Sequence, residues 1–229
     1  MLTMSVAVCL IVLLPLFGLL ADSPPNAYHR WYYNHEESTW KTAKWLGVPI
    51  EKCPMDMQVY QEILYETKPD VLIEAGTYKG GSAYFFASLF DFIGHGKVLT
   101  MDIVDYPGKP VHPRITYLTG SSTSEEMVAR VKGLIRPGDK VMVVLDSDPH
   151  KSHVLKEIQL YSPLVKVGSY LVVEDTNING HPVLPKFGPG PGEAVGEFLG
   201  SNRDFVPDET REKYGFTFNP GGWLKRVSE

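Results

Sequence analysis

The sequence predicts an α/β fold of the Rossmann-like kind, in which a mostly parallel sheet carries helices on both faces and ends in a C-terminal β-hairpin. Short apolar runs alternate with segments of helical spacing, which is typical of strand–helix–strand units. Such units connect in a right-handed sense and form parallel sheets. The last stretch has two β-rich pieces around a turn, which adds the hairpin.

The strands are apolar runs closed by a glycine or an acidic residue, and the helices between them have recognisable ends. One helix stops before Lys68-Pro69, a second stops at Gly94, and a third has Ser124 as its cap. In chain order, we expect strands at 70–76, 97–103, 114–120, 140–147 and 168–176, and helices at 55–67, 81–94, 124–135, 150–165 and 190–201.

The two ends of this region are less regular. Residues 31–53 are rich in aromatic side chains, and we expect helical stretches and a loop there. Near the C-terminus, we expect residues 214–218 and 223–227 to pair as a hairpin, because Asn219-Pro220-Gly221-Gly222 is a strong turn sequence.

Composition indicates one globular domain and excludes several classes of protein. The 229 residues are 43% hydrophobic, with 22 basic and 27 acidic side chains and a net charge of −5. This balance argues against binding of nucleic acid by bulk electrostatics, which favours a basic excess. The two cysteines cannot build a disulfide framework, and no cysteine–histidine zinc spacing occurs.

The N-terminal residues 1–21 form an uncharged apolar segment, and residues 22–30 are expected to be a linker to a domain at 31–229. A membrane anchor fits this segment best, with a cleaved signal peptide or a buried helix as alternatives. Because Arg30, Lys41 and Lys44 follow the segment and no basic residue precedes it, an anchor predicts a domain facing the cytoplasm. A soluble cytoplasmic protein and a protein of the secretory pathway are the alternatives.

Polar residues follow the predicted strands, where open parallel sheets bind ligands. The segment 74–82, EAGTYKGGS, lets the backbone turn sharply and approach a ligand at a helix N-terminus. Asp102, at the end of the next strand, is placed to accept both hydroxyls of a ribose. A tight turn without a ligand, and a helix cap or surface charge at Asp102, are the alternatives.

Carboxylates follow the fourth and fifth strands. Asp146 and Asp148 come after one, and Glu174 and Asp175 after the other. Oxygen ligands without cysteine or histidine suit a hard cation such as Mg²⁺, whereas the alternative use of these side chains is helix capping. No P-loop and no GxSxG nucleophile motif is present.

With these residues in place, the chain resembles the cephalosporin hydroxylase/rhamnosyl O-methyltransferase family of class I S-adenosylmethionine-dependent methyltransferases. The resemblance covers nearly all of 31–229 and is carried by the segments 45–56, 60–83, 94–103, 120–123, 144–176 and 188–195. It implies S-adenosylmethionine and Mg²⁺ as cofactors. The implied cofactor-binding residues are Glu74, Gly76, Thr77, Gly80, Gly81, Asp102, Ser121, Ser122 and Asp146, and the implied metal ligands are Asp146, Glu174 and Asp175.

The chain departs from the family where a general base is expected. The family often has Asp-Ser-Asp-His, but here Pro149 stands in the position of the histidine and His150 follows it. We therefore expect His150 or His153 to act as the base beside Asp146, because the histidine pKa suits proton removal at neutral pH. The alternative is that both are ordinary polar residues and the metal alone activates the acceptor.

Together these observations predict a Mg²⁺-dependent O-methyltransferase that acts on a hydroxyl of a glycoside or similar small polyol. A hydroxylase and a non-catalytic, membrane-tethered S-adenosylmethionine-binding domain are the alternatives. Acceptor-binding residues are expected within 31–53 and 176–192, where Trp31, Tyr33, Trp40 and His181 are candidates for a pocket, although ordinary packing explains them equally well. The oligomeric state, including a homo-oligomer, is left open.

Overall fold

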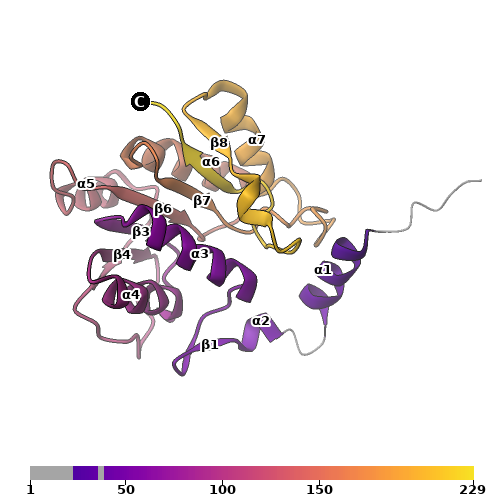
Figure 1. The fold of residues 1–229 in the computed structure, drawn as a ribbon, viewed down its shortest axis with the longest axis horizontal. Helices are drawn as coiled ribbons and strands as arrows, with labels where there is room; N and C mark the ends of the chain where they lie inside the picture. Colours follow the sequence, from indigo (N-terminus) through magenta and orange to yellow (C-terminus); the bar gives the residue numbers. More distant parts are fainter. Residues whose placement is uncertain (1–22, 36–38) are drawn as a thin grey trace, which may run out of the picture.

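A seven-stranded sheet forms the centre of the molecule, a computed structural model that describes residues 23–35 and 39–229 (Figure 1). The strand order is β5-β4-β3-β6-β7-β9-β8. The first five strands in this order are parallel, and β9 and β8 are antiparallel additions. The strands are β3 (Val71–Ala75), β4 (Lys97–Asp102), β5 (Ile115–Thr119), β6 (Val141–Leu145), β7 (Tyr170–Val173), β8 (Phe205–Pro207) and β9 (Trp223–Arg226).

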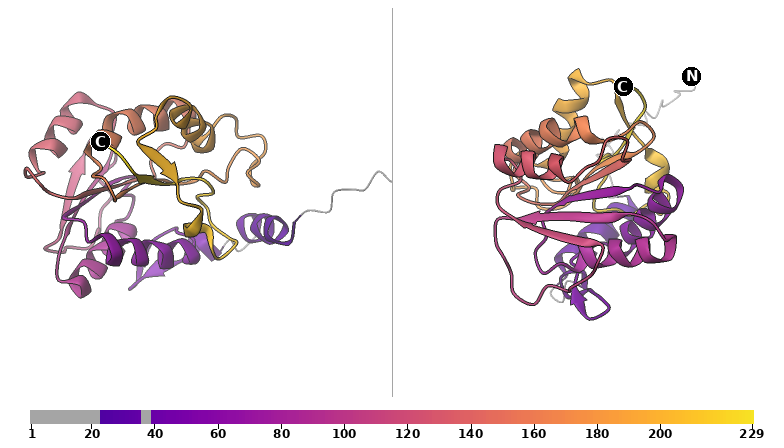
Figure 2. Two further views of the ribbon diagram at one scale, coloured as in Figure 1. Left: turned by 45° about the horizontal axis from the view of Figure 1, so that its top comes forward. Right: turned by 90° about the vertical axis from the view of Figure 1, so that its left-hand side faces the viewer.

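Helices cover both faces of this sheet, as the edge-on view in Figure 2 shows. Leu72 and Val98 pack towards α3 and α4, whereas their neighbours Ile73 and Leu99 pack towards α5, α6 and α7. This alternation follows from the two-residue period of a strand. The helices are α1 (Pro24–Asn34), α2 (Thr39–Thr42), α3 (Pro54–Thr67), α4 (Gly81–Ile93), α5 (Glu125–Gly133), α6 (Lys151–Tyr161) and α7 (Pro191–Ser201).

The strand order reverses between β3 and β6. From β3 the chain proceeds to β4 and β5 on one side, and then returns to β6 and β7 on the other. The loops after β3 and β6 therefore leave in opposite directions and open a crevice at the carboxyl ends of the strands. All the residues that the sequence singles out at strand ends lie at this edge.

The predicted helices and parallel strands are confirmed within a few residues, but two predictions at the ends of the chain are wrong. Residues 22–30 are not simply a linker, because α1 begins at Pro24: the Ser23 side chain caps the helix and Pro24 and Pro25 occupy its first turn. The C-terminal antiparallel pair exists, but its first strand is β8 rather than 214–218. Phe216 and Phe218 instead pack in an aromatic cluster with side chains of α1 and α2.

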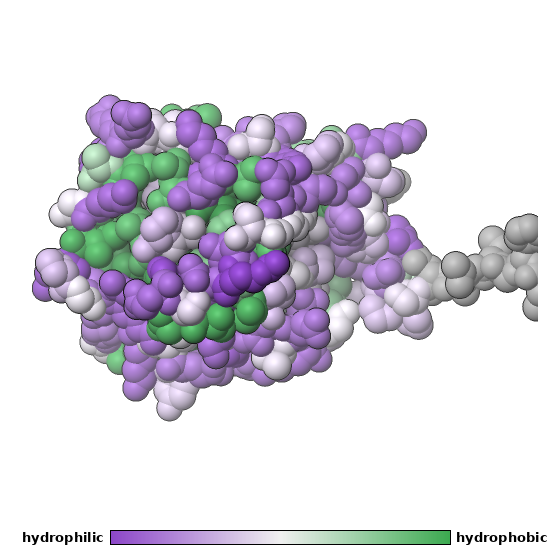
Figure 3. All heavy atoms as spheres, turned by 90° about the horizontal axis from the view of Figure 1, so that it is seen from above, coloured by the Kyte–Doolittle hydropathy of each residue, from purple (hydrophilic) through white to green (hydrophobic). Residues whose placement is uncertain are grey.

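Two short strands, β1 (Lys44–Trp45) and β2 (Val48–Pro49), form a small separate sheet beside α4. The face seen from above is mainly hydrophilic with hydrophobic patches between the polar side chains (Figure 3). The predicted apolar anchor at 1–21 lies outside the described residues. Within the described part of the chain, no helix is both long and apolar enough to cross a membrane.

Candidate functional site

A cleft of about 670 Å³ opens at the carboxyl ends of β3, β4, β6 and β7. The sequence-predicted residues that line it are Gly76, Thr77, Gly81, Asp102, Ser121, Ser122, Asp146, His153, Glu174 and Asp175. Glu74, Gly80 and His150 are not among the lining residues. Most of the predicted site residues are therefore brought together in one place by the strand order.

The glycines of the turn after β3 are needed for contacts within the protein. Gly76 has a φ of +100°, and a Cβ there would lie 1.8 Å from the backbone oxygen of Asp146. A Cβ on Gly81 would lie 2.0 Å from the backbone oxygen of Pro49. Any side chain at either position would displace backbone, so these two glycines let the turn pack against Asp146 at the end of β6 and against Pro49 in β2. Gly80 has a φ of +80° and is the N-cap of α4.

Glu74 supports this turn from behind. Its side chain is fully buried and accepts a hydrogen bond from the hydroxyl of Thr100 at 2.5 Å, and Thr100 in turn is 2.6 Å from the hydroxyl of Thr77. Burial raises the pKa of Glu74 to about 7. Glu74 thus positions Thr77, which itself lines the cleft.

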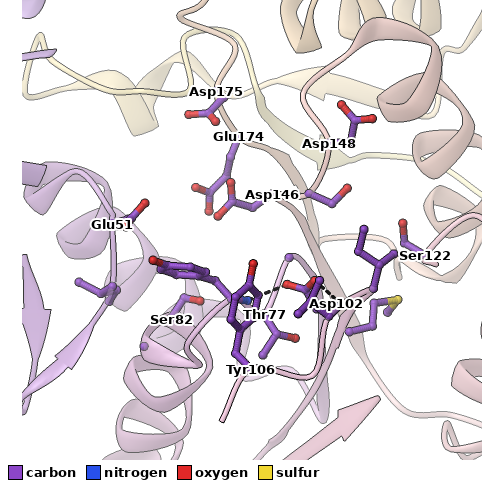
Figure 4. Close-up of a pocket in the computed structure, with 18 of the residues that line it drawn as sticks. Glu51, Thr77, Ser82, Asp102, Tyr106, Ser122, Asp146, Asp148, Glu174 and Asp175 are labelled. Atoms are coloured by element: carbon purple, nitrogen blue, oxygen red, sulfur yellow. Dashed lines mark hydrogen bonds between the residues drawn. The ribbon is translucent and has the colours of Figure 1, made fainter. Parts of the chain in front are cut away.

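Asp102 is oriented by two backbone groups. Its Oδ2 accepts a hydrogen bond from the amide of Tyr78 at 2.8 Å, and its Oδ1 accepts one from the amide of Val104 at 3.0 Å (Figure 4). Tyr78 adopts a left-handed φ of +46° in making this contact. Because each carboxylate oxygen has two lone pairs, both oxygens of Asp102 can still accept a hydroxyl from the cleft.

The two serines after β5 lie at the same end of the cleft as Asp102. The backbone oxygen of Ser122 accepts a hydrogen bond from the hydroxyl of Tyr161 at 2.7 Å, which fixes the loop. The hydroxyl of Ser121 lies 3.1 Å from that of Thr123. Both serines and Met101 line the cleft.

Three carboxylates and one buried lysine form the polar centre of the site. The carboxylates of Asp146 and Glu174 lie side by side, and that of Asp175 lies apart from this pair (Figure 4). The ammonium of Lys52 forms ion pairs with Asp146 and, at 2.7 Å, with Glu174. The hydroxyl of Tyr60 donates a hydrogen bond to the other Glu174 oxygen at 2.6 Å.

The electrostatics of this centre show an excess of negative charge. Burial and the nearby Asp146 charge raise the pKa of Glu174 to about 8 and that of Asp175 to about 7. Burial on its own would lower the pKa of Lys52, but the charges of Asp146 and Glu174 outweigh it and raise that pKa. With all three carboxylates ionised, one ammonium would leave two negative charges uncompensated, and the raised pKa values of Glu174 and Asp175 show that protons take up part of this charge.

The donor set fits a hard divalent cation in chemistry and in charge. The predicted ligands Asp146, Glu174 and Asp175 all line the cleft. Among the described residues, however, no three aspartate, glutamate, histidine or cysteine side chains are gathered into a ready-made coordination shell. Instead, Lys52 occupies the space between two of the predicted ligands.

The two predicted base candidates differ in position. His150 is the N-cap of α6, is exposed and does not line the cleft, although it pairs at 2.5 Å with Asp148, which does. His153 lines the cleft, and its Nε2 lies 3.3 Å from both the Glu157 carboxylate and the Ser122 hydroxyl. The hydrogen bond to Glu157 raises the pKa of His153, although partial burial acts in the opposite direction.

Sequence reasoning missed Lys52 and Tyr60 and did not decide among the aromatic residues. Of the four pocket candidates, only Trp40 lines the cleft; Tyr33 packs behind it, Trp31 is exposed on α1, and His181 pairs with Glu193. Lys52 directly follows the exposed Glu51 in the loop 50–53, and nothing in this local sequence distinguishes it from a surface lysine.

Comparisons with known proteins agree with each other. The family model described as Rhamnosyl O-methyltransferase/CmcI matches residues 37–227. The chain is 43% identical to a rhamnosyl O-methyltransferase of Mycobacterium leprae over 215 residues, which cover 90% of this chain and 91% of the relative. It is 42% identical to that of Mycobacterium tuberculosis over 222 residues, covering 92% and 88% of the two chains.

Solved structures show the same fold. A structure of CmcI described as holding Mg and SAM matches with a TM-score of 0.61 and 22% identity, covering 82% of this chain and 78% of that one. Together with the strand order, this likeness confirms the predicted class I methyltransferase architecture.

Proposed function

The chain belongs to the Rhamnosyl O-methyltransferase/CmcI family, and we propose that it transfers the methyl group of S-adenosylmethionine to a hydroxyl group of a rhamnosyl or closely related sugar. The observation that carries this proposal is the cleft itself, which brings the glycine turn, Asp102 and the carboxylate centre together. The identity to relatives with this printed activity, over nine-tenths of the chain, supports the same assignment.

Residues at one end of the cleft would hold the cofactor. Asp102 would accept the two ribose hydroxyls with the lone pairs that Tyr78 and Val104 leave free. The loop at Ser121 and Ser122 would lie beside the adenine. When bound, S-adenosylmethionine supplies a methyl group on a positively charged sulfur, and this sulfur is a good leaving group when an oxygen attacks the methyl carbon in line.

The carboxylate centre would hold Mg²⁺ through Asp146, Glu174 and Asp175, whose surplus of negative charge a divalent cation balances. When bound, the ion lowers the pKa of an acceptor hydroxyl and fixes its direction. Lys52 and Tyr60 hold Asp146 and Glu174 at the edge of the cleft, so these carboxylates are placed before any ligand arrives.

His153 is the residue that we assign to removal of the hydroxyl proton. Its ring lies at the cleft, and Glu157 orients it through Nε2. His150 has no comparable access, because it is not among the residues that line the cleft and its Nδ1 is paired with Asp148. Pro149, which occupies the family's histidine position, has no group that can accept a proton.

Hydroxylation, the alternative suggested by the family's other name, finds no support in the cleft. Iron-dependent oxygenases use two histidines and a carboxylate. Among the cleft residues that the structure describes, His153 is the one histidine. A non-catalytic role is not favoured either, since the carboxylates and the cofactor loop are all in place.

A methyl-transfer assay with isotopically labelled S-adenosylmethionine and a panel of glycosides tests the proposal. We expect labelled product from rhamnosides, loss of turnover in EDTA and recovery with Mg²⁺. Calorimetry with Asp102→Ala should show cofactor affinity reduced at least tenfold, with Asp105→Ala, an exposed aspartate nearby, as the control. Full turnover without metal would remove the cation from the proposal, and unchanged affinity in Asp102→Ala would remove the ribose contact.

A further inference from the structure

Beyond the carboxylates, the cleft ends at a group of aromatic side chains that we call the aromatic corner: Tyr33, Trp40 and Phe218. Trp40 and Phe218 line the cleft. Tyr33 stacks on Trp40 with ring centroids 5.0 Å apart, and Phe218 meets Trp40 edge-on at 5.7 Å. The corner joins α1, α2 and the segment before β9, which lie far apart in the sequence.

The corner is held in place by polar contacts of its own. The indole Nε1 of Trp40 donates a hydrogen bond to the backbone oxygen of Tyr33 at 3.2 Å. The amide of Phe218 donates to the buried carboxylate of Asp56 at 2.8 Å. Because the polar atom of Trp40 is already used, the surface that it adds to the cleft is apolar.

The corner adjoins the carboxylate centre through the segment that carries Phe218 and Asn219. The amide of Asp175 donates to the side-chain oxygen of Asn219, the residue next to Phe218, at 3.1 Å. A ligand on Trp40 and Phe218 would therefore have its polar groups towards Asp175, and Figure 4 shows Asp102 on the other side of Asp146 from Asp175.

Two charged side chains border this end. Glu51 lines the cleft and can accept a hydrogen bond from a hydroxyl (Figure 4). The ammonium of Lys41 lies 5.1 Å from the Trp40 ring centroid. Lys41 is exposed, so water can take up its charge when a ligand displaces it from the indole.

From this arrangement we propose that the aromatic corner is the binding subsite of the acceptor sugar. Trp40 packs against the C–H face of the ring, and the opposite hydroxyls point to the carboxylate centre. Sugars suit such a surface because one face of the ring is apolar while its edge carries hydroxyls, and the methyl group of a 6-deoxy sugar adds further apolar area. This inference rests on the proposed methyl transfer and names the site that would select the acceptor.

Substitution of Trp40 tests the subsite. We expect Trp40→Ala to raise the KM for 4-nitrophenyl α-L-rhamnoside at least tenfold while the calorimetric Kd for S-adenosylmethionine changes less than twofold. Trp40→Phe, which keeps an apolar ring, should give an intermediate KM and guards against misfolding of the alanine variant. Trp31→Ala is the matched control, because Trp31 is 57% exposed on α1 and does not line the cleft.

An unchanged acceptor KM in Trp40→Ala would overturn the subsite. So would an equal loss of cofactor affinity, since it would assign the corner to S-adenosylmethionine. If the parent protein methylates no glycoside, the proposed function fails, but the subsite can still be tested by saturation-transfer NMR of the same rhamnoside with the parent and the Trp40→Ala protein. Saturation-transfer signals from the sugar C–H protons should appear with the parent and disappear with the variant. Equal signals, or none with the parent, would overturn it.

Discussion

The buried ammonium of Lys52 stabilises the metal-free protein, and its removal should expose the charge imbalance of the site. In Lys52→Met the side chain keeps its length and loses its charge. Lys52 is 3% exposed and its partner Glu174 is 7% exposed, so the remaining carboxylate cannot recover full hydration. Removing one partner of a buried ion pair costs about 3–5 kcal/mol. Asp146 is 28% exposed, and water at that partner favours the lower end of the range.

A loss of about 3 kcal/mol corresponds to a fall in Tm of roughly 6–12 °C for a chain of this size. The measurement is thermal unfolding by circular dichroism in EDTA, with Lys186→Met as the control because Lys186 is exposed. Mg²⁺ should then raise the Tm of Lys52→Met more than that of the parent, because a cation that binds only the folded state stabilises it and no ammonium repels it there. A parent-like Tm in EDTA would refute the stabilising role of Lys52. A fall in Tm that Mg²⁺ does not reduce would refute the charge-balance argument.

Three further predictions concern other parts of the chain. His153→Ala should lower the methyl-transfer rate at least tenfold and abolish the acidic limb of the pH–rate profile, while the cofactor affinity stays unchanged. His150→Ala should keep the rate and the pH–rate profile of the parent. If both variants have the rate of the parent, neither histidine is the base. Burial lowers the pKa of His29 from 6.5 to about 4, so the unfolded chain takes up a proton that the folded one excludes, and stability should fall as the pH drops from 6.5 towards 4. His29→Gln should make the Tm less dependent on pH in this window, and an unchanged slope would contradict the assignment. We also propose that residues 1–21 anchor the protein with its domain in the cytoplasm; external protease should then spare the domain in intact cells, and ready digestion would reverse this topology.

The parts of the fold that follow local patterns could be predicted from the sequence. The run 71–75 is apolar over its whole length apart from Glu74, and it forms a strand buried on both faces. Ser124 caps α5 as its position before a helical pattern indicates. The start of α1 was missed because two prolines after Ser23 have the composition of a loop, although proline is equally at home in the first turn of a helix. The segment 214–218 has the composition of a strand, but its aromatic side chains pack against α1 and α2 instead of pairing in the sheet.

The polar centre could be predicted only in part, because its members meet through the fold rather than through the sequence. Asp146 and Glu174 could be predicted as site residues because they follow strands, and open parallel sheets bind ligands at the carboxyl ends of their strands. Lys52 contacts Asp146, which is 94 positions away in the chain, and Glu174, which is 122 positions away. No local sequence pattern predicts contacts over such distances. Tyr60 has the spacing of a core residue in α3, which it is, yet its hydroxyl also binds Glu174.

The glycine turn shows how a correct prediction can rest on an incomplete reason. The sequence suggests that its glycines admit a ligand, whereas Gly76 and Gly81 admit the backbones of Asp146 and Pro49. The second contact brings the segment that carries Glu51 and Lys52 against the start of α4, and so places Lys52 beside the carboxylates. A side chain at Gly81 would therefore disturb the carboxylate centre as well as the turn. The turn thus joins the cofactor end of the cleft to the residues that we assign to the metal and the acceptor.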